Sequence, residues 1–420
     1  MKTQIKAAYE LAKKQYEKYG IDTEAVLDKI NEIPISIHCW QGDDIKGFES
    51  TNEILSGGGI LSTANYPGKA RNINELRSDI EKAFSLIPGK KRLNLHAIYG
   101  DFNGKIVERD EILPEHFSSW VDWAKKLNIG LDFNPTLFSH QLAENGFTLS
   151  NSDEKIRKFW VEHVKRCRNI SNYFGMKLKD KCICNLWIPD GSKDITVSRL
   201  KYREILLKSL NEIFEIKYPE KNMTDAIESK LFGIAFESYT VGSHEFYLSY
   251  VIGKNILITF DTGHYHPTEI VSDKISAVLP FVKGILLHIS RGVRWDSDHV
   301  PILTDELVAI ANEVKRANSL NKIFIATDFF DASINRVGAW IIGTRAIQKS
   351  LFIALLEPSH ILKDYEEKNI LFARLGFMEA LKTMPYGSVW DYYCNSKGVL
   401  TDVEFINEVL KYEKEVTSKR

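Results

Sequence analysis

Eight short apolar runs, rich in β-branched residues, recur along this chain, and longer segments of helical periodicity separate them. Buried parallel strands have such nearly continuous apolar sequences, and helices connect them. The pattern therefore predicts a parallel sheet, and eight strands are the number that closes a (β/α)₈ barrel. The predicted strands are 35–39, 93–98, 129–133, 181–187, 226–234, 255–261, 284–289 and 322–328.

The segments between these runs have the spacing of amphipathic helices. Apolar residues recur at three- and four-residue steps in 74–87, 117–127 and 156–170, which is the period of a helix with one buried face. Asp153 and Thr304 stand just before helical segments, and both are residue types that cap helix N-termini.

These elements predict an α/β fold, a (β/α)₈ TIM barrel with a helical C-terminal extension. An open, doubly wound sheet is the alternative, but no G-x-G-x-x-G motif follows the first predicted strand. We place the barrel, with an N-terminal helical segment, in residues 1–335. Residues 336–420 form the extension, which we expect to pack on the barrel or on a neighbouring subunit.

Charge and composition indicate the class of partner. The 55 Lys and Arg residues nearly balance the 56 Asp and Glu residues, so nothing suggests a surface that attracts nucleic acid or anionic lipid. No apolar stretch approaches the roughly 18 residues that span a bilayer. The five cysteines are scattered along the chain, which is typical of free thiols in a reducing compartment. We expect a cytoplasmic protein with a small-molecule substrate and neither nucleic acid nor membrane partners.

Acidic and imidazole side chains gather where the later strands end. The candidates are Glu228, Lys230, Asp261, His264, His288, Asp296, Asp298 and Asp328. The carboxyl ends of barrel strands converge on one mouth, and so many carboxylates cannot be buried there without a counter-charge. Mostly oxygen ligands with some imidazole suit Mn²⁺, Mg²⁺ or Co²⁺ better than the thiolate-rich sites of zinc. The sequence therefore predicts a metal site at the barrel mouth.

Each of these residues also has an ordinary structural interpretation. Asp261 is typical of a turn or helix cap, His288 of a hydrogen-bonded core histidine, and Lys230 of a surface lysine. Their joint occurrence at four successive strand ends favours the metal site.

Other candidate residues are less specific. His96 alternates into the barrel from the second strand, where it either faces a substrate or is satisfied in the core. Trp187, Phe133 and Phe329 lie near strand ends. They suit either a wall that stacks on a sugar or packing at the top of the barrel.

Several longer motifs resemble the L-rhamnose isomerase family. The segments that carry the resemblance are 66–71, 93–99, 226–233, 237–246, 263–269, 294–299 and 328–336. The resemblance extends over nearly the whole chain, and none of these motifs departs from the family at a motif position. The resemblance implies a barrel of the xylose-isomerase-like group, a homotetramer, and two divalent metals. These are usually Mn²⁺, with Co²⁺, Mg²⁺ or Zn²⁺ as substitutes.

The resemblance also implies roles for the candidates and a reaction, the isomerisation of L-rhamnose to L-rhamnulose. One metal would be held by Glu228, Asp261, His288 and Asp328. The second would be held by His264, Asp296 and Asp298, with Asp261 bridging. Lys230 would hold the C1 oxygen of the sugar, and His96 would assist ring opening at O5.

Elementary chemistry agrees with this reaction. Moving hydrogen between C2 and C1 needs O1 and O2 polarised together, which two cations do without a redox cofactor. A lysine at O1 stabilises developing negative charge. If the hydrogen instead passes through an enediol, a metal-bound hydroxide or Asp296 is the candidate base. Two other functions remain open: a metal-dependent endonuclease, which needs a basic groove, and a non-catalytic sugar-binding barrel, which needs neither adjacent metals nor Lys230.

Overall fold

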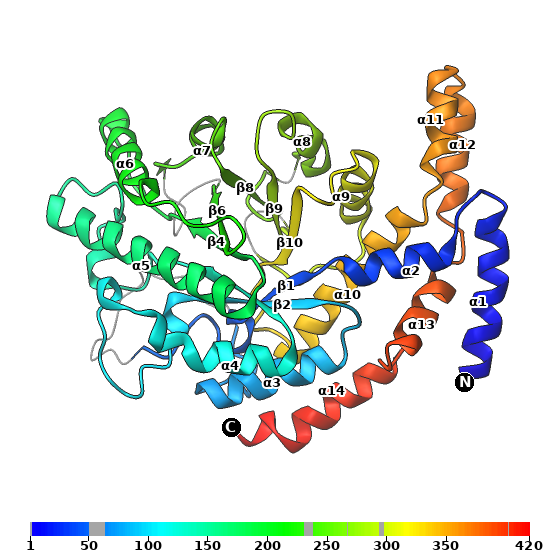
Figure 1. Cartoon of the computed structure of the whole chain (residues 1–420), viewed down its shortest axis with the longest axis horizontal. Helices are drawn as coiled ribbons and strands as arrows, with labels where there is room; N and C mark the ends of the chain where they lie inside the picture. The colour runs from blue at the N-terminus through cyan, green and yellow to red at the C-terminus, as the bar shows by residue number, and fades with distance from the viewer. Residues whose placement is uncertain (1, 50–63, 231–237, 267, 294–297, 402) are drawn as a thin grey trace.

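Eight parallel strands close into a barrel in the order β1-β10-β9-β8-β6-β4-β3-β2 (Figure 1). The computed structural model describes residues 2–49, 64–230, 238–266, 268–293, 298–401 and 403–420. The barrel strands are β1 Ile35–His38, β2 Lys91–His96, β3 Gly130–Asn134, β4 Cys182–Trp187, β6 Met223–Glu228, β8 Ile256–Asp261, β9 Ile285–Ile289 and β10 Ile323–Thr327. A small antiparallel pair, β5 Gly191–Ser192 and β7 Tyr239–Thr240, lies outside the barrel. The predicted fold class is confirmed.

Helices follow the barrel strands and cover their outer faces (Figure 1). They are α3 Ile73–Ser85, α4 Ser118–Leu127, α5 Glu154–Leu178, α6 Arg199–Phe214, α7 His244–Val251, α8 Val271–Val278, α9 Asp305–Arg316 and α10 Arg336–Leu355. Asp153 caps α5 by accepting from the Lys155 amide, and Thr304 caps α9 by accepting from the Leu307 amide. Both predicted caps are confirmed, and each satisfies an amide that the first helical turn leaves unpaired.

The fifth barrel strand differs from its predicted bounds of 226–234. It begins earlier, at Met223, and ends at Glu228, so Lys230 lies two residues beyond it. Residues 231–234 lie outside the described part of the chain.

Inward-facing side chains form layers inside the barrel, because side chains along a strand alternate between its two faces. An apolar layer lies deepest on five neighbouring strands: Ile183, Ala226, Leu257, Leu286 and Ala326. Two residues further along each strand is a polar layer: Asn185, Glu228, Thr259, His288 and Asp328. Two residues further again are Trp187, Lys230, Asp261, Ser290 and Phe330. The apolar layer therefore closes the barrel beneath its charged side chains.

The remaining helices belong to the two ends of the chain. They are α1 Lys2–Glu17, α2 Thr23–Glu32, α11 Ser359–Glu367, α12 Leu371–Leu381, α13 Tyr386–Ser396 and α14 Glu404–Glu415. Helix α1 packs against α13, and α11 pairs with α12 in a hairpin that extends away from the barrel (Figure 1). Helix α10, which begins the predicted extension, packs against α9, α3 and β1. The proposed boundary at residue 335 stays a prediction.

The length and composition of the helices in the described residues bear on whether any could span a membrane. No single helix there is both long and apolar enough to cross a bilayer, and one bent pair, α10 with α11, passes by length and composition alone. Sixteen residues of α10 are buried within the protein, as expected for a core helix.

Candidate metal centre

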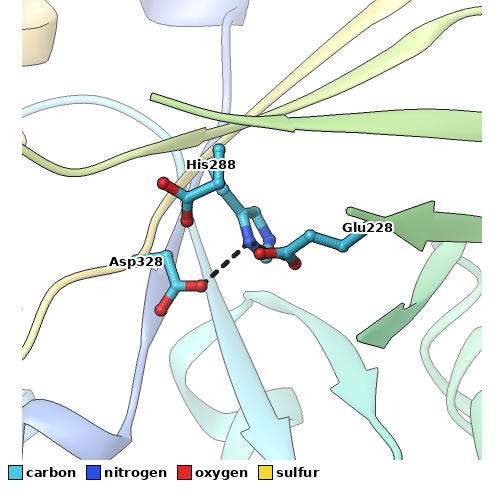
Figure 2. Close-up of side chains that lie close together, drawn as sticks. Glu228, His288 and Asp328 are labelled. Atoms are coloured by element: carbon cyan, nitrogen blue, oxygen red, sulfur yellow. Dashed lines mark ion pairs between the residues drawn. The ribbon is translucent and has the colours of Figure 1, made fainter. Parts of the chain in front are cut away.

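Four side chains, each on a different barrel strand or directly after one, meet at the carboxyl end of the barrel. Glu228 ends β6, Asp261 ends β8, His288 lies on β9, and Asp328 follows β10. Each offers one ligand atom, and these atoms all lie within 4.8 Å of one another. His288 Nδ1 is 3.1 Å from both Glu228 Oε2 and Asp328 Oδ2 (Figure 2). We name these four residues the four-residue group.

A second group of possible ligands shares Asp261 with the first. It contains Asp261, His264 and Asp298, again with ligand atoms within 4.8 Å of one another. His264 Nδ1 lies 3.1 Å from the Ser229 carbonyl oxygen, while Nε2 lies 3.8 Å from Asp261 Oδ2. Asp298 has a φ of 40°, a strained backbone conformation of a kind that clusters at functional sites.

Asp296, the remaining predicted ligand and candidate base, lies outside the described residues. The structure therefore brings together every predicted metal ligand that it describes.

Buried polar atoms at this site have the character of metal ligands. Among the described residues, Glu228 Oε1, Asp261 Oδ2 and His288 Nε2 are buried without a hydrogen-bond partner. Buried polar atoms normally have partners, because leaving one unsatisfied costs on the order of 1–3 kcal/mol. Buried carboxylate oxygens together with imidazole nitrogens are the donor set that a divalent cation takes. The residues therefore fit a metal.

The pKa values show how strongly these groups interact. Burial, with the charges of Asp328 and Glu228, raises the pKa of Asp261 well above its ordinary value. Burial lowers the pKa of His288, but the carboxylates of Glu228 and Asp328 outweigh it and raise that pKa well above its ordinary value. The same pairing with His288 overcomes burial at Asp328 and lowers the pKa of its carboxyl. Without a cation, the four-residue group thus holds protons in its place.

A cavity lies against the metal ligands. Lys230, His96 and Trp187, predicted as catalytic or sugar-binding residues, all line it. Lys230 Nζ is 5.0 Å from the centre of the Trp187 ring, in a cation–π arrangement. The cavity therefore brings together the ammonium group of Lys230, the aromatic face of Trp187 and the carboxylates of the ligand groups.

His96 is held as a neutral imidazole at this cavity. Its Nδ1 is 3.0 Å from Thr136 Oγ1, and the Trp40 and Phe138 rings contact it edge-on, with ring centroids 4.7 and 5.5 Å away. Burial lowers the pKa of His96 to about 3. At neutral pH this side chain carries one ring proton, which it can share with a substrate oxygen.

His163 supports His96 through Thr136. Its Nε2 accepts the Thr136 backbone N–H at 3.0 Å, and its Nδ1 lies 2.9 Å from the Arg109 carbonyl oxygen. Burial lowers the pKa of His163 to about 3. Since the unfolded chain has imidazoles of ordinary pKa, it binds more protons below about pH 6.5, so acid destabilises the fold.

We expect His163→Gln to weaken this acid sensitivity, because glutamine also offers an acceptor and a donor but does not titrate. Each such histidine contributes a slope of about 1.4 kcal/mol per pH unit below its unfolded pKa. Denaturant unfolding between pH 7 and pH 5 should show a shallower slope for the variant. An unchanged slope would mean that His163 is not neutral in the fold.

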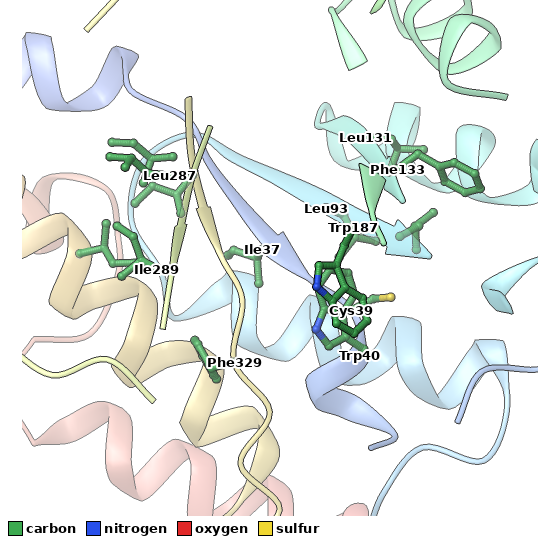
Figure 3. Packing of buried hydrophobic residues seen from close by; sticks show 14 of the residues in the cluster. Ile37, Cys39, Trp40, Leu93, Leu131, Phe133, Trp187, Leu287, Ile289 and Phe329 are labelled. Atoms are coloured by element: carbon green, nitrogen blue, oxygen red, sulfur yellow. The ribbon is translucent and has the colours of Figure 1, made fainter. Parts of the chain in front are cut away.

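Two aromatic residues predicted at the sugar face lie elsewhere. Phe133 is fully buried and contacts Phe117 and Phe174, with ring centroids 4.9 and 5.5 Å away, on the helix-facing side of β3 (Figure 3). Phe329 is also fully buried, against Gly343 of α10. Both point outward because side chains alternate along a strand, so the prediction was wrong for these two.

Other cavity residues were missed in the sequence. They are Trp40, Ile45, Asn134, Phe138, Asn185 and Phe330. Asn134 and Phe330 directly follow the two aromatics that were predicted in their place. The alternation of side chains between the two faces of a strand could have identified Phe330. It lies two residues after Asp328 and therefore shares its face.

A closed parallel barrel with carboxylates and imidazoles at its carboxyl end defines a (β/α)₈-barrel enzyme. The L-rhamnose isomerase family model matches residues 3–420. The L-rhamnose isomerase of Salmonella agona (strain SL483) is 53% identical over 420 residues, 100% of both chains. That of Bacteroides thetaiotaomicron is 53% identical over 416 residues, 99% of both chains. The chain belongs to the L-rhamnose isomerase family and is a sugar isomerase.

Two solved structures are similar to this chain at low sequence identity. A D-tagatose 3-epimerase-like protein is 12% identical, with a TM-score of 0.48, and the match covers 68% of this chain and 95% of that one. An L-ribulose 3-epimerase is 12% identical, with a TM-score of 0.48, and the match covers 76% and 95%. The fold assignment rests on the closed strand order of this chain itself.

Proposed function

We propose that this protein converts L-rhamnose to L-rhamnulose with two divalent metals, and that Mn²⁺ is the preferred metal. The observation that carries the proposal is the pair of ligand groups that share Asp261 beside one cavity. The name of the relatives, which match over their full lengths, supports the choice of sugar.

The residues that would hold the metals follow from these groups. Glu228, Asp261, His288 and Asp328 would hold one, and Asp261, His264, Asp298 and Asp296 the other. When bound, the two cations would polarise O1 and O2 of the sugar. Described cysteines take no part in either group, so the donors favour Mn²⁺, Mg²⁺ or Co²⁺ over zinc.

The chain's own residues would bind and orient the sugar. Lys230 would donate to O1, where negative charge develops as the carbonyl moves from C1 to C2. Neutral His96 would share its ring proton with O5 as the pyranose opens. The Trp187 ring would lie against C–H groups of the sugar. All three side chains already line the cavity.

The route of the hydrogen can be tested together with the reaction itself. Among the described cavity residues, each carboxylate, at Glu228, Asp298 and Asp328, belongs to a ligand group, and the low pKa of His96, about 3, makes it a weak base. A direct shift from C2 to C1 needs no base at the C2 hydrogen, and the reaction balances because the proton lost from O2 ends on O1. We expect L-rhamnose deuterated at C2 to give L-rhamnulose with most of the label on C1, measured by NMR.

The outcomes of this experiment separate the reaction from its route. No L-rhamnulose under any metal would refute the proposed function. L-rhamnulose whose label has exchanged with solvent would refute the direct shift alone, and Asp296 would become the candidate base.

We also propose a homotetramer in the cytoplasm, in which α12 contacts another subunit. None of its residues is buried, and Phe372 and Leu375 are 89% and 68% exposed. Apolar helix faces are normally covered in globular proteins. The cytoplasm agrees with the five buried, unbridged cysteines.

A charge on α12 is expected to break this assembly. Phe372→Asp should convert the tetramer into smaller species without unfolding the subunit, because Phe372 packs against little in its own chain. Val197→Asp, at a side chain that is 92% exposed on another part of the surface, is the matched control and should leave the tetramer intact. Light scattering coupled to gel filtration measures both. An intact Phe372→Asp tetramer would exclude α12 from the interface.

A further inference from the structure

A chain of two hydrogen bonds leads from Thr259 to the metal ligand Glu228. Thr259 Oγ1 donates to Asn185 Oδ1 at 2.7 Å, and Asn185 Nδ2 donates to Glu228 Oε2 at 2.6 Å. Asn185, Glu228 and Thr259 lie on the three neighbouring strands β4, β6 and β8. Their side chains are 2%, 1% and 0% exposed, so water does not compete for these bonds.

The hydroxyl of Thr259 decides which way the Asn185 amide points. The side-chain amide accepts hydrogen bonds on Oδ1 and donates them from Nδ2. A hydroxyl proton therefore bonds to Oδ1. With Oδ1 held by Thr259, Nδ2 faces the Glu228 carboxylate. In the flipped amide, Oδ1 would face that carboxylate, and the two oxygens would repel each other. Thr259 thus stabilises the orientation that Glu228 needs.

The bond from Asn185 fixes one oxygen of Glu228 and turns the other toward the second ligand group. Oε2 accepts from Asn185, whereas Oε1 is buried without a hydrogen-bond partner among the described residues and lies 3.2 Å from His264 Nδ1. The other two carboxylates of the four-residue group also accept on Oδ1, but Asp328 Oδ2 already faces His288 Nδ1 at 3.1 Å. Asp328 accepts Trp40 Nε1 on Oδ1 at 3.0 Å, and Asp261 accepts the Gly263 amide on Oδ1 at 2.7 Å and leaves Oδ2 open.

This arrangement matters because ligands fixed before binding lose less entropy when the cation arrives. Partners behind metal ligands hold them in one orientation, and their loss typically weakens metal binding by about 10- to 100-fold. We propose that Thr259 is a positioning residue that acts through Asn185 to orient Glu228 for cation binding. The inference rests on the proposed metal centre and adds two residues to it: Asn185, which bonds to the Glu228 carboxylate, and Thr259, which reaches that carboxylate only through Asn185.

The test compares Mn²⁺ dissociation constants, measured by calorimetry on metal-free protein, for two variants of Thr259. Thr259→Val keeps the shape but removes the hydroxyl, and should weaken Mn²⁺ binding about 10-fold. Thr259→Ser keeps the hydroxyl and should restore the affinity. Thr344→Val, a buried threonine of α10, is the matched control and should bind Mn²⁺ like the parent.

A double-mutant cycle shows whether Thr259 acts through Asn185. Asn185→Ala should weaken Mn²⁺ binding, and adding Thr259→Val should weaken it no further, because the bond it removes is already lost. Additive losses, or tight binding by Thr259→Val, would overturn the inference. Failure of the parent protein to bind Mn²⁺ would instead refute the proposed metal centre. Thermal unfolding of each metal-free variant separates lost affinity from lost fold.

Discussion

Dialysis against EDTA is expected to abolish the isomerisation of L-rhamnose, and Mn²⁺ or Co²⁺ to restore it. Three carboxylates and an imidazole in the four-residue group have ligand atoms within 4.8 Å of one another. Without a cation, the raised pKa values of Asp261 and His288 keep protons on these side chains, so O1 and O2 lose their electrophile. Lewis-acid polarisation contributes several kcal/mol, so the rate should fall by about 10³-fold or more.

The experiment needs a control for other effects of the chelator. EDTA saturated beforehand with Mn²⁺ should leave the activity unchanged, and elemental analysis should show that each inactive sample is free of metal. Circular dichroism of the dialysed protein checks that the barrel persists. Full turnover by a sample with no measurable metal would contradict the proposed role of both ligand groups.

Much of the fold could be predicted from the sequence because the strands of a parallel barrel are buried on both faces. Each strand therefore has a nearly continuous apolar sequence. The ligands could be found for a related reason, since Asp261 and His288 lie at strand ends, and strand ends converge in this fold. The apolar run after Glu228 misled the prediction of β6, because apolar composition alone does not mark where a strand stops.

The sugar-facing wall was harder to predict because the interior of this barrel is polar in places. On β3 the inward side chains are Asp132 and Asn134, which bond to Arg92 and Asn94 of β2. The aromatic Phe133 between them faces the helices instead. Sequence reasoning placed the aromatic residue at the cavity, whereas side-chain alternation along the strand decides the face. Trp40 begins a short 3₁₀ helix after β1, and Phe138 lies in the loop after β3, so neither has a strand alternation to follow.

Lys230→Met is expected to reduce the maximal rate by about 10²- to 10⁴-fold, the range for losing a positioned electrostatic or proton-transfer group. Lys230 lies in the cavity rather than in either ligand group, and its Nζ sits over the Trp187 ring. Methionine keeps the length of the side chain and its packing on that ring. Both metals should therefore remain bound, while the negative charge that develops on O1 loses the hydrogen-bond donor that stabilises it.

A matched variant and a kinetic distinction make this prediction specific. Lys283→Met removes a lysine that pairs with Glu220 at 3.0 Å, and Lys283 does not line the cavity, so its kcat should match the parent. An interaction made only in the transition state lowers kcat and kcat/KM together, whereas uniform substrate binding raises KM alone. Because charge on O1 grows during the reaction, we expect the first pattern for Lys230→Met. A raised KM with unchanged kcat would assign Lys230 to sugar binding, and loss of Mn²⁺ would tie it to the metal centre.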